Sequence, residues 1–155
     1  MEHLKEFIQK AEQYCSYQER CHAEVRKKLN ALGLKNNESE EIIVHLISQN
    51  FLNEERFAYI FSRSKFNQKK WGKERIKKEL KSRQISDYLI TKALNEIPDE
   101  EYENLFELLS EKQWEIIQEK NLLKKRKKFC DFLLRKGYES NRVYERMKEL
   151  ESRES

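Results

Sequence analysis

Apolar residues recur along this chain every three or four positions, which is the spacing of one face of an α-helix. The first stripe consists of Leu4, Phe7, Ile8, Ala11 and Tyr14. It predicts a helix over residues 4–15. The following segment, Ser16-Tyr17-Gln18-Glu19, has the form of a capping box and predicts that a second helix begins there.

One frame of residues then occurs three times. An apolar residue is followed four positions later by leucine, four further on by a residue that ends the helix, and then by another apolar residue. The copies consist of Val25, Leu29, Gly33 and Leu34; of Ile76, Leu80, Gln84 and Ile85; and of Phe129, Leu133, Gly137 and Tyr138. Apolar residues recur ten and thirteen positions past each terminator: Ile43 and Leu46, Leu94 and Ile97, and Met147 and Leu150. A frame shared by three copies indicates an internal repeat.

The period of about 50 residues suits three short helices in each repeat, stacked end to end. A further helix precedes the second and third frames, within 53–65 and from Pro98 onward. We therefore predict an all-α fold, an elongated array of three tandem three-helix modules. The modules comprise residues 1–52, residues 53–97 and residues 98–155, and the third begins with a long helix.

The composition agrees with several small cores rather than one large core. Charged residues make up 39% of the chain and hydrophobic residues 37%, and only three glycines and one proline interrupt the helices. Three cysteines, an odd number without paired spacing, argue against a disulfide framework and favour the cytoplasm. The amino terminus does not have the form of a secretory signal, and no apolar run is long enough to span a membrane.

The net charge of +4 permits a polyanionic partner without requiring one. On a helical wheel, Lys124, Lys128 and Arg135 form a line in the third module, with Lys125 and Lys127 beside it; Arg126 falls within the apolar arc. The second module has the densest basic run, scattered around its helix axis. It consists of Lys69, Lys70, Trp71, Lys73, Arg75, Lys77 and Lys78. These residues are the candidate nucleic-acid or partner contacts, because lysines on phosphates give salt-sensitive binding without sequence preference.

Simpler interpretations stand beside this one. Charge runs on short helices are often solvated faces that keep a protein soluble. Trp71 can stack on a base or wedge into a partner, but its position next to Gly72 favours a lid packed over the next helix.

The sequence shows no recognisable catalytic or metal-binding chemistry. Cys15, Cys21 and His22 lack the paired spacing of zinc ligands, and packing is the favoured role of the last two. The three glycines are too far apart for a phosphate-binding loop. We therefore expect no enzyme activity, no metal and no cofactor.

Residues 16–97 resemble the RecX family of bacterial recombinase regulators. The resemblance is carried by a Leu-Asp-Asp…Arg-Phe-Ala junction and by a Gly…Arg-Ile…Glu-Leu helix. The matching residues are Leu52, Asn53, Glu54, Arg56, Phe57 and Ala58, and then Gly72, Arg75, Ile76, Glu79 and Leu80. Asn53-Glu54 replaces the acidic pair of the family. Gln84 stands where the family often has glycine, so a left-handed terminator there costs about 1 kcal/mol.

The resemblance implies a monomer that binds the filament of the RecA recombinase on DNA. It further implies a negative effect on filament growth, strand exchange and RecA-stimulated repressor cleavage, and hence a role in homologous recombination, DNA repair and the SOS response. Direct contact with single- or double-stranded DNA is an additional expectation, and no membrane is involved. Two alternatives remain open: a sequence-independent nucleic-acid-binding module that acts alone, and a helical adaptor for another protein.

Overall fold

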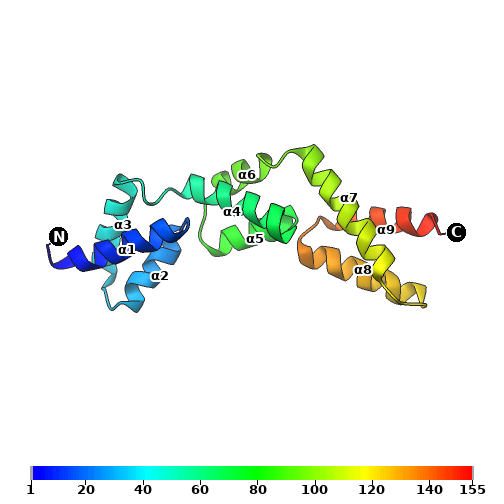
Figure 1. Cartoon of the computed structure of the whole chain (residues 1–155), viewed down its shortest axis with the longest axis horizontal. Helices are drawn as coiled ribbons and strands as arrows, with labels where there is room; N and C mark the ends of the chain where they lie inside the picture. Colours follow the sequence, from blue (N-terminus) through cyan, green and yellow to red (C-terminus); the bar gives the residue numbers. More distant parts are fainter. Residues whose placement is uncertain (1, 155) are drawn as a thin grey trace. The chain divides into compact units, whose positions relative to one another are not determined.

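The computed structural model describes residues 2–154, and within that range the chain is all-helical with no strand (Figure 1). A short 3-10 helix, η1 (Glu2–Leu4), leads into α1. The α-helices are α1 (Lys5–Tyr17), α2 (His22–Ala31), α3 (Asn36–Ser48), α4 (Glu54–Lys69), α5 (Lys73–Ser82), α6 (Asp87–Asn95), α7 (Asp99–Ile116), α8 (Leu122–Lys136) and α9 (Ser140–Ser152). The predicted all-α class is confirmed. No helix in the described range is long and apolar enough to cross a membrane.

The threefold sequence frame corresponds to one helix ending that is made three times. The terminators of α2, α5 and α8 are Gly33, Gln84 and Gly137, and all three have left-handed backbone, with φ of 98°, 63° and 105°. In each case the amide of the next, apolar residue donates to the carbonyl of the frame's leucine, at 3.1–3.2 Å. The frame therefore encodes a Schellman ending, in which a left-handed residue allows the chain to turn back onto its own helix.

The helices form two compact units, which we describe separately. The first unit contains the described residues up to 61 together with 80–93, and the second contains 62–79 together with 94 onward. Helices α4, α5 and α6 each contribute residues to both units. The division into three modules stays a prediction.

In the first unit, α1, α2 and α3 enclose a small apolar core. The core is formed by Leu4, Ala11, Cys15, Val25, Leu29, Ile42, Ile43, Leu46 and Leu52. Val25, Leu29 and Leu46 are fully buried, as their places in the frame predict. The buried positions of each helix lie three or four residues apart, so one stripe of each helix faces this core.

The predicted capping box at Ser16–Glu19 is wrong, because α1 continues through Ser16 to Tyr17. Helix α2 begins later, and its box consists of Cys21 and Glu24, whose carboxylate accepts the Cys21 amide at 3.0 Å. Glu19 instead pairs with Arg56 of α4 at 2.8 Å. The Glu19 carboxylate, which the local pattern assigned to capping, therefore pairs with a residue that is distant in the sequence.

The second unit has an aromatic core between α7, α8 and α9. Tyr138, which follows the α8 terminator, packs against Tyr102 and Phe106 of α7, and Trp114 meets Phe129 edge to face. Arg146 is also buried here, and its guanidinium donates to the hydroxyl of Ser110 at 2.9 Å and to Glu149 at 3.0 Å. These bonds satisfy a charge that is costly to bury alone.

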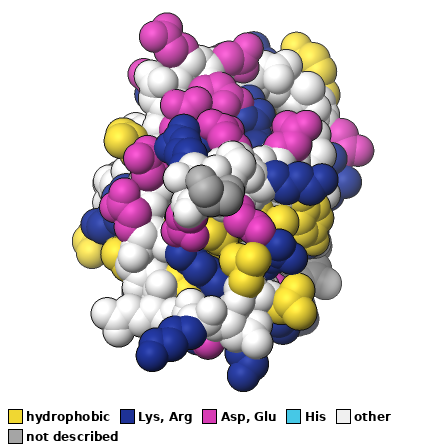
Figure 2. Space-filling view, turned by 90° about the vertical axis from the view of Figure 1, so that its right-hand side faces the viewer, with side chains coloured by type: hydrophobic (Ala, Val, Ile, Leu, Met, Phe, Trp, Pro, Cys, Tyr) yellow, Lys and Arg dark blue, Asp and Glu magenta, His cyan; other side chains and the backbone are white. Residues whose placement is uncertain are grey.

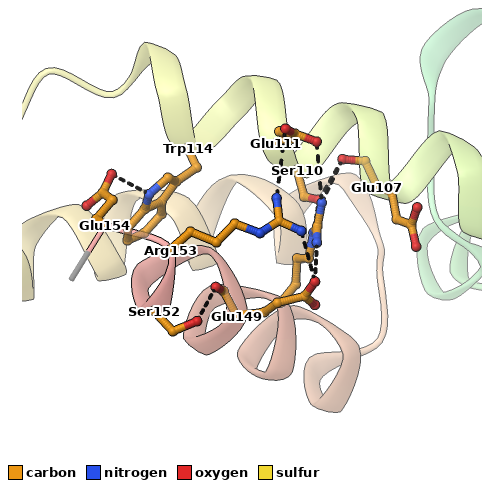
Figure 3. A network of polar contacts seen from close by, with 9 residues as sticks. Glu107, Ser110, Glu111, Trp114, Glu149, Ser152, Arg153 and Glu154 are labelled. Atoms are coloured by element: carbon orange, nitrogen blue, oxygen red, sulfur yellow. Dashed lines mark hydrogen bonds and ion pairs between the residues drawn. The ribbon is translucent and has the colours of Figure 1, made fainter.

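Further ion pairs close the edge of this core (Figure 3). Arg153, at the end of α9, reaches Glu149 at 3.1 Å and Glu111 of α7 at 3.8 Å. The indole nitrogen of Trp114 donates to Glu154 at 2.8 Å. Acidic residues of α7 and α9 are thus engaged by the unit's own cations.

Replacing Gln84 by glycine tests the repeated helix ending. Gln84 has φ of 63°, a conformation that costs a residue with a side chain about 1–2 kcal/mol. The Gln84→Gly variant relieves that strain but gains conformational freedom when unfolded. We expect a net stabilisation of about 0–1 kcal/mol, measured by urea denaturation. Destabilisation by more than about 1 kcal/mol would contradict this assignment.

Candidate nucleic-acid interface

The second unit contains a close backbone junction between the start of α5 and the end of α8. Gly72, just before α5, is buried, and a Cβ atom added there would overlap the backbone of Gly137. A Cβ atom added to Gly137 would lie 2.6 Å from the Arg75 nitrogen. Glycine is therefore needed at both positions for the two chain segments to approach this closely.

Three successive amides at the start of α5 donate to groups outside their own helix. The Gly72 amide donates to the Lys136 carbonyl at 2.8 Å, and the Glu74 amide donates to the Gly137 carbonyl at 2.9 Å. The Lys73 amide between them donates to the hydroxyl of Tyr102 at 2.9 Å. The first amides of a helix have no partner within it, and neither do its last carbonyls. At this junction, the unpaired amides come from the start of α5 and the unpaired carbonyls come from the end of α8.

Side chains hold the same junction. The Tyr138 hydroxyl donates to the Lys70 carbonyl at 2.9 Å, and the Lys136 ammonium donates to the Lys69 carbonyl at 3.0 Å. Arg75 donates to the Arg135 carbonyl at 3.2 Å. The junction thereby brings cationic residues from two distant parts of the sequence close to one another.

We call this set of cations the junction patch: Lys69, Lys70, Arg75, Arg135 and Lys136. Within residues 2–154, none of the five forms an ion pair with an acidic side chain. Burial, and after it the charges of Arg75, Lys70 and Lys69, lower the pKa of Lys136 from its ordinary value. Like charges thus repel one another here without a compensating acid.

Trp71 lies half-buried beside this patch. The Arg75 guanidinium lies over its indole ring at 4.1 Å from the centroid, and the Lys65 ammonium lies at 5.1 Å. Cations over an aromatic face are attracted by the ring quadrupole. The ring therefore helps to hold Arg75, a residue of the next helix, in position.

Part of this arrangement has an ordinary structural explanation. Lys69, Arg135 and Lys136 lie in the last turns of α4 and α8, where cations favour the negative end of the helix dipole. Lys70 lies just past α4 in left-handed backbone, with φ of 59°, and Arg75 lies in the first turns of α5. The dipoles of their own helices do not account for these last two cations.

The amino-terminal half of α8 differs, because the four cations that follow Lys124 are paired. The pairs are Lys125 with Glu154 at 3.1 Å, Arg126 with Glu151 at 2.5 Å, Lys127 with Asp131 at 2.8 Å and Lys128 with Glu119 at 3.1 Å. Hydrogen bonds from these cations hold the pKa values of Glu154, Glu151 and Glu119 below their ordinary range. Figure 2 shows acidic and basic side chains interspersed on the face where α9 ends.

The predicted contact residues thus do not all lie together in the structure. It brings together Lys69, Lys70, Trp71 and Arg75, and Arg135 contacts Arg75 through its backbone carbonyl. Lys73 has its ammonium over the ring of Tyr102, at 4.8 Å from the centroid. Lys77, Lys78 and Lys124 are exposed.

Lys136 was not among the predicted contact residues. The helical wheel placed the cations of the third module relative to one another, and it did not include contacts with other modules. The position of Lys136 next to the terminator Gly137 was the available signal.

Comparisons with known proteins agree with this architecture. Residues 53–94 match the model of a family domain described as RecX, second three-helix domain. A regulatory protein RecX of Bacillus cytotoxicus is 31% identical over 126 residues, and one of Bacillus thuringiensis is 29% identical over 125 residues. Each alignment covers 81% of this chain and 46% of the relative, so the chain spans about half the length of these curated proteins.

Solved structures extend the similarity to almost the whole chain. The crystal structure of RecX from Lactobacillus salivarius superposes with a TM-score of 0.79 at 27% identity, covering 96% of both chains. A second crystal structure, of a regulatory protein RecX, gives a TM-score of 0.77 at 25% identity, covering 92% of this chain and 71% of the other.

The helical fold, the repeated helix endings and the matching three-helix domain define the class as a helical-repeat protein. Within that class, the chain is similar to RecX proteins, through the domain match over residues 53–94 and through the fold of the RecX crystal structures.

A pair of glycine variants tests the junction. Gly33 and Gly137 are both left-handed terminators, but a Cβ atom at Gly33 meets nothing within 4 Å. We expect Gly33→Ala to cost about 1–2 kcal/mol of stability through backbone strain alone. Gly137→Ala adds overpacking against Arg75, worth about 1–3 kcal/mol more. Denaturation of the two variants measures this difference, and equal losses would show that the close approach is unimportant.

Proposed function

We propose that this chain binds the RecA nucleoprotein filament and negatively modulates its assembly, strand exchange and coprotease activity. Similarity to RecX proteins in sequence and fold supports this proposal most strongly, and the curated relatives are named regulatory proteins. The proposed action is binding alone, and in this proposal ATP hydrolysis belongs to RecA.

The physical basis of such regulation is linkage. A ligand shifts an equilibrium only as far as its affinity differs between the states, so the chain must discriminate between assembled and free RecA. Repeated modules provide one route, because contacts to several neighbouring subunits act together on a filament and not on a monomer. The hydrogen-bonded junction fixes the start of α5 relative to the end of α8, and this reduces the ordering cost of simultaneous contacts.

Filament extension on single-stranded DNA tests the proposal directly. RecA polymerisation is followed while the protein is titrated in, and RecA ATPase activity is recorded in parallel. Because a chain bound to the filament is proposed to block its growth, we expect extension and DNA-dependent ATPase activity to fall together as the protein approaches saturation. Preformed filaments provide a second arm, in which the same protein accelerates disassembly or blocks further growth.

The control is the same titration with bare DNA in place of the filament. Filament growth that stays unchanged at saturating, folded protein would contradict the proposal. If the protein captures neither RecA nor DNA, the alternative of a helical adaptor for another partner would be favoured.

A further inference from the structure

The junction patch combines positive charge with an absence of apolar anchors. The large apolar residues exposed in the second unit's described part are Leu108, Ile116, Leu122, Leu123 and Tyr144. None of them lies in the segments 69–75 or 135–138 that form the patch. Lysine is depleted in protein–protein interfaces, and Lys69, Lys70 and Lys136 make up most of the patch. The patch is therefore better suited to a partner that presents negative charge.

We propose that the junction patch is a composite site for the phosphate backbone of nucleic acid, assembled by docking the start of α5 against the end of α8. This inference goes beyond the proposed function, because it requires no RecA. Neither segment forms the site alone: 69–75 supplies Lys69, Lys70 and Arg75, and 135–136 supplies Arg135 and Lys136.

Electrostatics give the patch its affinity for a polyanion. The charges of Lys69, Lys70 and Arg75 act on Lys136, and Arg135 joins them through its carbonyl, which accepts from Arg75. No acidic side chain in the described range pairs with these five cations. A phosphate placed among them relieves their mutual repulsion and forms charge-assisted hydrogen bonds. Arg75 is positioned by Trp71 and by the Arg135 carbonyl, and only one of its guanidinium bonds is taken by that carbonyl. Its remaining N–H groups are available to phosphate oxygens.

Phosphate contacts of this kind carry no sequence information, so binding is expected to be sequence-independent and salt-sensitive. Side chains of Lys69, Lys70 and Arg135 form no hydrogen bond or ion pair within residues 2–154. They can therefore be neutralised without removing a contact that holds the fold.

The test compares two triple variants of the full chain with the same loss of charge. One carries Lys69→Gln, Lys70→Gln and Arg135→Gln in the patch. The matched control carries Lys124→Gln, Lys127→Gln and Lys128→Gln in the amino-terminal half of α8. Circular dichroism and thermal melting establish that both are folded. Affinity for mixed-sequence single-stranded and duplex oligonucleotides is then measured across a range of salt, without RecA.

For duplex DNA we expect the patch variant to have a shallower salt dependence, by about 1 in the log–log slope for each lost contact and about 3 in all. The control is expected to keep a slope close to that of the unmodified chain. Equal losses in both variants, or no loss in the patch variant, would overturn the composite site. If the unmodified chain binds no oligonucleotide while the patch variant no longer inhibits RecA, the patch faces an acidic protein surface instead.

A negative result in the oligonucleotide measurements leaves the proposed function intact, because those measurements contain no RecA. Conversely, oligonucleotide binding by a chain that does not affect filament extension would support the patch and reject the proposed function.

Discussion

The second unit depends on how the chain satisfies the first amides of α5. Helix starts are usually completed by a side chain just before the helix or by water, since their amides have no partner within the helix. At α5 the acceptors are instead the carbonyls of Lys136 and Gly137 and the hydroxyl of Tyr102. The start of α5 is therefore completed by residues that lie far away in the sequence.

This constraint accounts for several features together. Gly72 and Gly137 must lack side chains, because the bonds require their backbones to approach closely. Tyr138 packs in the aromatic core and donates to the Lys70 carbonyl, so the core and the junction share one residue. The cations that surround the junction follow from its position at the ends of α4 and α8. Their gathering into one patch is a consequence of the backbone contact.

Sequence periodicity predicted local structure well and long-range partners poorly. The frame that ends at Gly33, Gln84 and Gly137 identified three left-handed helix endings, even where glutamine replaces glycine, because a helix ending is determined within a few residues. Glu19 was assigned to a helix cap, whereas its partner is Arg56 of α4. The basic line on α8 was predicted without its acidic partners: Lys128 pairs with Glu119, and Lys125 beside the line pairs with Glu154, just past α9. Lys136 was missed for the same reason, since its relation to Lys69 exists only in the folded chain.

Amide hydrogen exchange at Gly72 and Glu74 tests this account most directly. The matched reference is Asn141, an amide in the first turn of α9, where no side chain caps the helix. If the carbonyls of α8 hold the start of α5, the Gly72 and Glu74 amides exchange only when the second unit opens, far more slowly than Asn141. Exchange of all three at the rate of a frayed helix start would show that the junction is not formed in solution.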